Sequence, residues 1–442
     1  NTLFSGPAGG VIATAGLGKR VGIHNLIAFD MGGTSTDVCL IREGEPAKKN
    51  QREMAGMPVR ARTLDIHTIG AGGGSLAWVD PGGLMKVGPQ SAGAIPGPAG
   101  YGRGGDRPTV TDANLVLGRL NQKTLLNGRM AVYPDRAVKA VESIAKPLGL
   151  DLVQAAAGIV SIVNVNMMGA VRVVSVEQGE DPRDYTLVAF GGAGPLHAAD
   201  IAREMGIRRV FVPPHPGLLS ALGLLHADTR GDFSLTRILV ATPAAIPSLR
   251  DGLADLAQRG QAWIAGEGVA GGEVAFEWQM DMRYLGQAFE LILPMPSDRM
   301  DEEALATMVS RFHARHREFN GYDVPEHPVE IVNLRLVVTA HRPSAPPETA
   351  GSARARLADA VLDRRRVWFA ETGYVETPVY DRDRLPADAM FAGPAIIEQM
   401  DATTVVPPEA EVQTDAFGNL FIEVKSAVGR LEVSEWAEKL TL

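Results

Sequence analysis

The chain has 442 residues, with 43 lysine and arginine side chains against 52 aspartate and glutamate side chains, a net charge of -9. This length allows about three domains and excludes a small disulfide-stabilised fold, while the acidic balance argues against nucleic acid or an anionic membrane as a partner. The single cysteine, Cys39, excludes an internal disulfide and a thiolate metal cluster, which predicts a cytoplasmic protein.

The first quarter of the chain is unusually rich in glycine. It opens at Asn1 without an initiating methionine, and 23 of the 49 glycines fall within the first 105 residues. Such a density indicates backbone that folds closely against something. We interpret the opening as a piece of a longer chain. No apolar run reaches the 18 residues of a membrane helix, so no membrane span is expected.

The elements of the first half are expected in this order. Residues 26–29 and 38–41 predict a hairpin across a Gly-Gly turn. A short helix is expected from Asp112, the predicted N-cap, and an amphipathic helix over 135–148. An apolar helix over 152–174 has few polar positions, so we expect it to be buried on several sides.

The second half begins with a strand–turn–helix–strand unit over 185–213, which predicts a parallel pair of strands beneath a helix. Helices are expected near 247–265 and 301–319, and they alternate with strands expected at 273–283, 287–293 and 328–341. A linker is expected near 342–354. Short strands follow, with a helical or frayed tail from Glu432. We therefore predict three domains, over residues 1–240, 241–345 and 346–442, the last a small β-rich domain.

The sharpest motif runs from Phe29 to Asp37 and places an acid at a strand end, then two glycines, three hydroxyls and a second acid. Gly32 and Gly33 would let backbone N–H groups approach phosphate oxygens. Thr34 and Ser35 could donate hydrogen bonds to phosphate. Asp30 or Asp37 could hold the waters of a magnesium ion. An ordinary hairpin would show the same glycines, but we favour the phosphate site.

Two further glycine clusters leave their roles open. Gly191, Gly192 and Gly194 lie between a strand and a helix, where a helix N-terminus can bind an anion and where close packing is an equal alternative. Gly72, Gly73 and Gly74 form a run that predicts close approach either to a ligand or to a second backbone. The chain contains neither a dinucleotide glycine motif nor a Walker loop.

Together these motifs resemble the A subunit of the hydantoinase/oxoprolinase family. The resemblance rests on long matches in chain order, which are Ser5–Gly10, Phe29–Asp37, Thr68–Ser75, Gly88–Pro98, Thr109–Asn114, Phe190–Pro195, Asp281–Gln287 and Gly393–Glu398. The matches extend over nearly the whole chain and are far more specific for family than for substrate.

The resemblance implies an α/β fold, an actin-like ATPase with two ribonuclease-H-like halves that clamp ATP. In that fold Asp30–Asp37 resembles the second phosphate loop and Gly191–Gly194 the adenosine-binding turn. The implied reaction is ATP-dependent hydrolysis of a cyclic amide, such as a hydantoin, 5-oxoproline or a lactam, through phosphorylation of the amide oxygen. A B-type subunit, separate or fused, is the expected partner.

The family normally begins with a further domain that carries an Asp-Gly-Gly-Thr hairpin, and nothing like it precedes Asn1. The core is therefore expected to be incomplete at its N-terminus. We favour a fragment of a longer chain, and the alternatives are that another polypeptide supplies the loop or that the protein no longer turns over ATP.

Within this reading we assign catalytic roles to Asp30 and Asp37. Asp30 is the metal ligand, for Mg²⁺ or alternatively Mn²⁺ or K⁺. The three glycine clusters, with Thr34 and Ser35, are assigned to ATP. Asp37 and Asp112 are second-rank candidates, since a helix cap or a turn residue is an equal alternative for each. The alternatives are a ketone carboxylase subunit and a non-catalytic actin-like assembly or reactivating factor.

Overall fold

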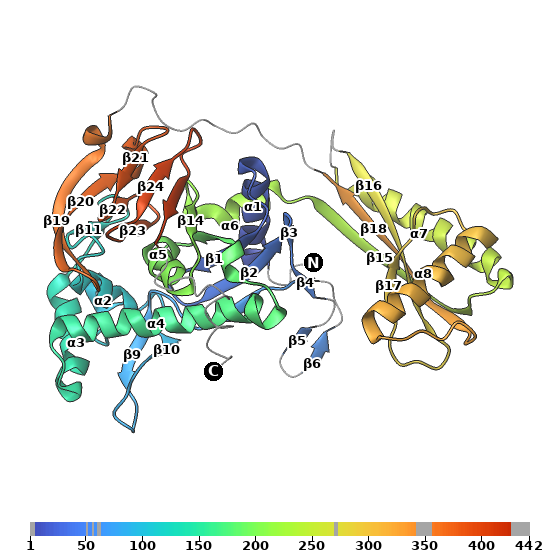
Figure 1. The fold of residues 1–442 in the computed structure, drawn as a ribbon, viewed down its shortest axis with the longest axis horizontal. Coiled ribbons are helices and arrows are strands. Elements are labelled where there is room, and N and C mark those ends of the chain that lie inside the picture. The colour runs from blue at the N-terminus through green and yellow to red at the C-terminus, as the bar shows by residue number, and fades with distance from the viewer. Residues whose placement is uncertain are drawn as a thin grey trace, which may run out of the picture. The chain divides into compact units, whose positions relative to one another are not determined.

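The structure, a computed structural model, describes residues 5–49, 52–54, 57–59, 63–268, 273–341 and 356–425. They fall into two compact units (Figure 1). Unit 1 comprises Asn1–Leu225 together with Pro347–Leu442, and unit 2 comprises His226–Pro346. The expected linker at 342–354 and the tail from Glu432 lie outside the described residues.

The centre of unit 1 is a nine-stranded sheet. Its middle consists of the antiparallel pair β1 (Leu26–Met31) and β2 (Thr36–Arg42), followed by β13 (Thr186–Phe190), parallel to β1, and β14 (Arg209–Val212), parallel to β13. This confirms the predicted hairpin and the predicted parallel pair. The outer strands are β3 (Glu45–Pro46), β8 (His67–Ile69), β25 (Leu420–Glu423), β24 (Glu411–Thr414) and β21 (Met390–Ala392).

Helices cover this sheet on both faces because its central strands are apolar on both. Ile27 and Phe29 of β1 belong to the core cluster that includes α4 (Leu152–Val174) and α5 (Gly194–Met205). Leu26 and Ala28 belong instead to the cluster formed with α1 (Ser5–Val21) and Leu219. Successive side chains of β1 therefore point to opposite faces of the sheet and pack against different helices, as the period of two in a strand requires.

The helix α1 lies where the glycine-rich sequence predicted no helix. Glycine is a poor helix former, so propensity argues against this element. Its apolar residues Val11 and Ala15 are buried against the sheet, and this tertiary packing outweighs the local preference.

The C-terminal segment differs most from the predicted organisation. Instead of a separate β-rich domain, its strands β21, β24 and β25 extend the central sheet beyond β14. Four further strands form a second sheet in the order β19 (Val361–Phe369), β20 (Gly373–Asp381), β22 (Ala395–Glu398) and β23 (Thr403–Val406), which packs on α5. The expected boundary at residue 240 lies between Leu225 and His226 in the structure.

Three further helices of unit 1 lie in stretches where the sequence predicts helices. The helix α2 (Val110–Val116) is capped by Thr109 rather than by Asp112, which is the third helical residue of the capping box. The helices α3 (Pro134–Leu148) and α4 match the expected ranges. Together with its continuation to Gln178, α4 has the length and composition of a membrane span, but half of that window is buried within the unit and its exposed positions include Gln154 and Asn166. Its burial pattern is that of a core helix.

Unit 2 is a four-stranded antiparallel sheet with two helices on one face. The strand order is β15 (Thr229–Val240), β18 (Val329–Ala340), β16 (Val274–Tyr284) and β17 (Leu291–Pro294). The helices α7 (Ile246–Gly266) and α8 (Glu302–Asn320) share its hydrophobic core. Both helices and three of the strands were predicted, but β15 was not.

The remaining elements are short. The helix α6 (Leu219–His226) ends at the border of the two units, and β9 (Ser75–Val79) pairs with β10 (Met85–Ser91). The short strands are β4 (Lys48–Lys49), β5 (Arg52–Met54), β6 (Met57–Val59), β7 (Thr63–Leu64), β11 (Thr124–Leu125) and β12 (Met130–Ala131). The 3-10 helices are η1 (Ala99–Tyr101), η2 (Val176–Gln178), η3 (Pro182–Asp184), η4 (Pro216–Leu218), η5 (Pro243–Ala245), η6 (Leu357–Ala360) and η7 (Arg382–Arg384).

Candidate functional site

The motif from Phe29 to Asp37 forms the hairpin of β1 and β2. Asp30 is paired in register with Asp37, and the Gly32 N–H donates to the Ser35 carbonyl at 3.0 Å, which closes the turn. Gly33 and Thr34 are exposed at the tip, and a methyl group at Gly33 would meet no atom within 4 Å. The hairpin therefore ends in an open tip with an acid on each strand.

The glycine run at Gly72–Gly74 packs against the base of this tip. The Gly73 N–H donates to the Gly32 carbonyl at 3.0 Å, and the Gly74 N–H donates to the Gly33 carbonyl at 2.6 Å. A Cβ on Gly72 would lie only 2.6 Å from the Thr34 nitrogen. The close approach predicted for this run is thus made to a second backbone, and its contact with a nucleotide stays a prediction.

Hydroxyl groups hold the same two segments together. Thr36 Oγ1 donates to the Ala71 carbonyl at 2.6 Å, and Thr68 Oγ1 donates to Asp37 Oδ1 at 2.5 Å. From α2, Thr111 Oγ1 donates to the Gly73 carbonyl at 2.8 Å. The tip is therefore fixed from below by several elements, which favours a preformed binding site.

The third glycine cluster lies beside Asp30. Gly191 has φ of +76°, and a Cβ there would overlap Asp30 Oδ1. The Ala193 N–H donates to the Met31 carbonyl at 2.9 Å, and the Gly191 N–H donates to the Pro216 carbonyl at 2.8 Å. The fold therefore brings the turn Gly191–Gly194 and the Asp30 hairpin together, although more than 150 residues separate them in the chain.

Asp30 sits between these elements in a half-buried position. Ser220 Oγ of α6 donates to Asp30 Oδ2 at 3.1 Å. Burial raises the pKa of Asp30 to about 6, the Ser220 hydrogen bond opposes this rise, and the charge of Asp37 adds to it. A carboxyl group with a raised pKa beside an open glycine turn is a mark of a functional site.

The donor set at this hairpin fits Mg²⁺. The described part of the chain holds no group of three or more His, Cys, Asp and Glu side chains that could enclose a metal by themselves. Mg²⁺ is commonly held by one or two carboxylates, with waters and substrate phosphates as its other ligands. Asp30 and Asp37 would supply those carboxylates. A bound cation would favour the ionised form of Asp30, against the burial and, to a smaller extent, the charge of Asp37 that raise its pKa.

Asp112, the second-rank candidate, is built into the scaffold instead. Its buried carboxylate accepts the N–H of Gly100 at 2.7 Å and the hydroxyl of Thr109 at 2.7 Å. These bonds satisfy hydrogen-bond donors at the start of α2 and in the neighbouring loop. The side chain has a structural role.

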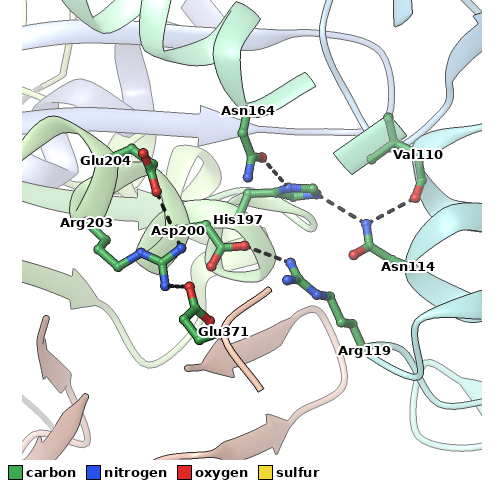
Figure 2. Close-up of polar contacts among 9 residues, drawn as sticks. All are labelled: Val110, Asn114, Arg119, Asn164, His197, Asp200, Arg203, Glu204 and Glu371. Atoms are coloured by element: carbon green, nitrogen blue, oxygen red, sulfur yellow. Dashed lines mark hydrogen bonds and ion pairs between the residues drawn. The ribbon is translucent and has the colours of Figure 1, made fainter. Parts of the chain in front are cut away.

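A buried polar network fixes the helix that follows the Gly191 turn (Figure 2). His197 of α5 is fully buried, with Nδ1 2.8 Å from Asn164 Oδ1 of α4 and Nε2 3.3 Å from Asn114 Nδ2 of α2. Arg119 forms an ion pair with Asp200 at 2.8 Å. Burial and the charge of Arg119 lower the pKa of His197 to about 3, so the imidazole is neutral.

Sequence reasoning did not find Ser220 or the two asparagines. Ser220 follows no motif and lies 190 residues from Asp30. Asn164 lies in the apolar helix α4, and Asn114 ends the motif Thr109–Asn114, but nothing in either stretch of sequence shows that the two side chains meet at His197.

Two family models match the chain. The model for Hydantoinase/oxoprolinase matches residues 1–233, and the model for the Hydantoinase/oxoprolinase C-terminal domain matches residues 241–425. The caprolactamase subunit alpha of Pseudomonas jessenii is 37% identical over 421 residues, which cover 94% of this chain and 60% of that subunit. The crystal structure of the ATP-dependent caprolactamase from this organism has a TM-score of 0.76, with 34% identity and coverage of 94% of this chain and 61% of that chain.

Two carboxylases are also similar. The acetophenone carboxylase gamma subunit of Aromatoleum aromaticum is 32% identical, over 96% of this chain and 59% of that subunit. A nucleotide-free structure of acetone carboxylase has a TM-score of 0.84 with 26% identity, over 95% of this chain and 61% of that chain. The chain spans about three fifths of the length of these relatives. It belongs to the hydantoinase/oxoprolinase family and has that family's actin-like ATPase core.

Proposed function

We propose that the complete protein is an ATP-dependent hydrolase of a cyclic amide, and that this chain supplies the second phosphate loop and the adenosine turn. The observation that carries the proposal is the placement of Asp30, which lies between an open hairpin tip on one side and Gly191 on the other. ATP-dependent caprolactamase, with the same core, supports the reaction class.

Each part of the site has a separate task. Gly32, Gly33, Thr34 and Ser35 would hold the terminal phosphates, and the turn Gly191–Gly194 would hold the adenosine. Asp30, ionised above a pH of about 6, would hold magnesium-bound water or polarise the attacking oxygen, with Asp37 beside it. ATP supplies a phosphoryl group that gives the amide carbon a good leaving group. This division of labour needs no covalent nucleophile from the chain, because phosphoryl transfer depends on positioning and charge neutralisation.

The proposal includes two partners. A domain with the first phosphate loop would complete the clamp, and a B-type subunit would complete the hydrolysis in the cytoplasm. The length of the relatives supports the first of these, since this chain covers only 60% of the caprolactamase alpha subunit.

A ketone carboxylase subunit is the second candidate. The structure of acetone carboxylase supports it, because its TM-score of 0.84 exceeds that of the caprolactamase structure, 0.76. The two candidates share the nucleotide site and differ in the acceptor of the phosphoryl group.

The test uses the complete protein with its partner subunit. Caprolactam, 5-oxoproline and hydantoin should stimulate ATP hydrolysis, and Asp30→Ala should abolish it while the fold stays intact. The matched control is Asp255→Ala, which removes an exposed carboxylate on α7. Unchanged turnover in Asp30→Ala would refute the assignment. Fixation of labelled bicarbonate into a ketone would favour the carboxylase, and stimulation by a protein partner alone would favour an assembly factor.

A further inference from the structure

The signature Gly393–Glu398 of the C-terminal segment has no role in the site described so far. It contains β22, which forms a hairpin with β23. The hairpin turns at residues 399–402, where the Gln399 N–H donates to the Ala402 carbonyl at 3.1 Å. Asp401 in this turn lies 184 residues from Gly217 in the chain, and the fold brings the two together.

The turn 399–402 holds the segment 213–217, which leads from β14 to α6. Asp401 Oδ2 accepts the Gly217 N–H at 2.8 Å. Gln399 Nε2 donates to the Pro214 carbonyl at 2.8 Å and to Asp401 Oδ1 at 2.6 Å. One oxygen of the Asp401 carboxylate therefore binds the segment directly, and the other orients a side chain that binds it a second time.

Gly217 leaves room for Asp401. A Cβ on Gly217 would lie 2.8 Å from both the Cβ and the carbonyl oxygen of Asp401. Gly217 belongs to the 3-10 helix η4, so the lack of space favours glycine here rather than a left-handed backbone. A Cβ on the exposed Gly192 would lie 3.6 Å from the same carbonyl oxygen. Asp401 therefore borders the open side of the turn Gly191–Gly194.

The segment 213–217 in turn fixes the Gly191 turn. The Gly191 N–H donates to the carbonyl of Pro216, the residue next to Gly217, at 2.8 Å. A continuous path of hydrogen bonds and one peptide unit thus leads from the Asp401 carboxylate to Gly191.

The start of the same segment is held by a different side chain. Arg382 is buried, and its Nη2 donates to the carbonyls of Val212 and Pro213, each at 3.1 Å. The end of β14 therefore has an anchor of its own. Loss of Asp401 should loosen the Gly217 end of the segment and leave the strand in place.

We infer that Asp401 is a positioning residue for ATP, which holds Gly217 and, through the Pro216 carbonyl, sets the position of the Gly191 turn. The turn 399–402 would then border the adenosine end of the site, and the C-terminal segment would take part in nucleotide binding. The inference rests on the proposed function, because it takes the Gly191 turn as the place of the adenosine.

The experiment titrates the complete protein, in the presence of Mg²⁺, with ATP or with inorganic tripolyphosphate, which lacks the adenosine. Asp401→Ala removes the acceptor of the Gly217 N–H and should weaken ATP binding about tenfold. Tripolyphosphate should bind with unchanged affinity, because the tip of the β1–β2 hairpin is held by the run Gly72–Gly74 instead. In ATP hydrolysis the KM for ATP should rise about tenfold while kcat stays the same.

Two further variants and a control accompany Asp401→Ala. Asp401→Asn keeps a carbonyl oxygen for the Gly217 N–H and should bring the affinity for ATP back toward that of the unsubstituted protein. Gly217→Ala disturbs the same contact from the other side, so it should act like Asp401→Ala and decides the test if that variant does not fold. The matched control is Glu411→Ala, which removes an exposed carboxylate of β24 and should change neither affinity.

An unchanged preference for ATP over tripolyphosphate in Asp401→Ala would overturn the inference. An equal loss of affinity for both ligands would also overturn it, because a general loss of structure has that effect. A different result would strike the proposed function itself. If the unsubstituted protein bound ATP no more tightly than tripolyphosphate, the Gly191 turn would not hold the adenosine.

Discussion

Gly32-Gly33 and Gly72–Gly74 lie against each other in unit 1, yet their surroundings differ. A Cβ on Gly33 would meet nothing within 4 Å, whereas one on Gly72 would lie 2.6 Å from the Thr34 nitrogen. The first pair is half-buried to exposed and the second run is buried. Glycine is needed at the run because another backbone fills the space. At the tip the space is open, as the proposed contact with phosphate oxygens requires.

The largest expected change in stability concerns Gly72, and it tests whether the run is packed against another backbone. Gly72→Ala should lower the free energy of unfolding by about 3 kcal/mol. The three atoms nearest to the new methyl group belong to the backbone, so no rotamer change can make room for it. Urea unfolding of the complete protein measures the change. A stability equal to that of the unchanged protein would show that the run is not packed as described.

The second expected change in stability concerns His197, which is buried in α5, the helix that follows the Gly191 turn. Its pKa is about 3 in the folded protein, below the usual 6.5, so the stability it contributes is complete above pH 6.5 and is lost as the pH falls toward 3. Between pH 6.5 and pH 5 the loss should be about 2 kcal/mol relative to His197→Gln, which does not titrate. If the free energy of unfolding had the same pH dependence in the two proteins, His197 would not be a buried neutral imidazole.

The third expected effect is a gain in stability when Asp30 is replaced. Because burial raises the pKa of Asp30 to about 6, the ionised carboxylate costs stability as the pH rises above 3.8, and the cost is complete above pH 6. Asp30→Asn should therefore stabilise the ligand-free protein by about 2 kcal/mol at pH 8, after allowance for residual exposure, and by almost nothing near pH 4. A variant that is less stable at pH 8 would show that Asp30 is a structural residue.

The smallest expected change in stability concerns Gly33 at the tip of the hairpin, and it distinguishes the tip most clearly from the run Gly72–Gly74. Gly33→Ala should leave the free energy of unfolding unchanged within about 0.5 kcal/mol, since the methyl group has free space around it. It should weaken ATP binding about tenfold, because the tip can no longer approach phosphate oxygens as closely. Calorimetric titration with ATP and Mg²⁺ measures this, and unchanged affinity would place the phosphates elsewhere.

The parts of the fold predicted from sequence are those with local signals. The hairpin of β1 and β2 follows from alternating apolar residues around a glycine turn, and the parallel pair of β13 and β14 follows from a strand–turn–helix–strand order. The bounds of α4 follow from its continuous apolar pattern.

The parts that were missed depend on distant partners. The helix α1 needs the α6 backbone beside Gly9. The strand β25 was expected, but its place in the central sheet depends on β14 as its neighbour. The position of Asp30 depends on Ser220. None of these pairings leaves a pattern within a single stretch of sequence. For the same reason the acids at the hairpin were identified from their motif, while the residue that holds Asp30 was not.

The insertion of unit 2 between the two parts of unit 1 has a consequence for synthesis on the ribosome. β14 obtains its neighbour β25 only after Leu420–Glu423 has been translated, whereas every strand of unit 2 has been made by Ala340. The later-encoded insert can therefore mature first, while one edge of the central sheet stays open for about 10–40 seconds at ordinary elongation rates of about 5–20 residues per second. During that interval the unpaired edge of β14, whose residues Val210, Phe211 and Val212 are apolar, is exposed to pairing with strands of other chains.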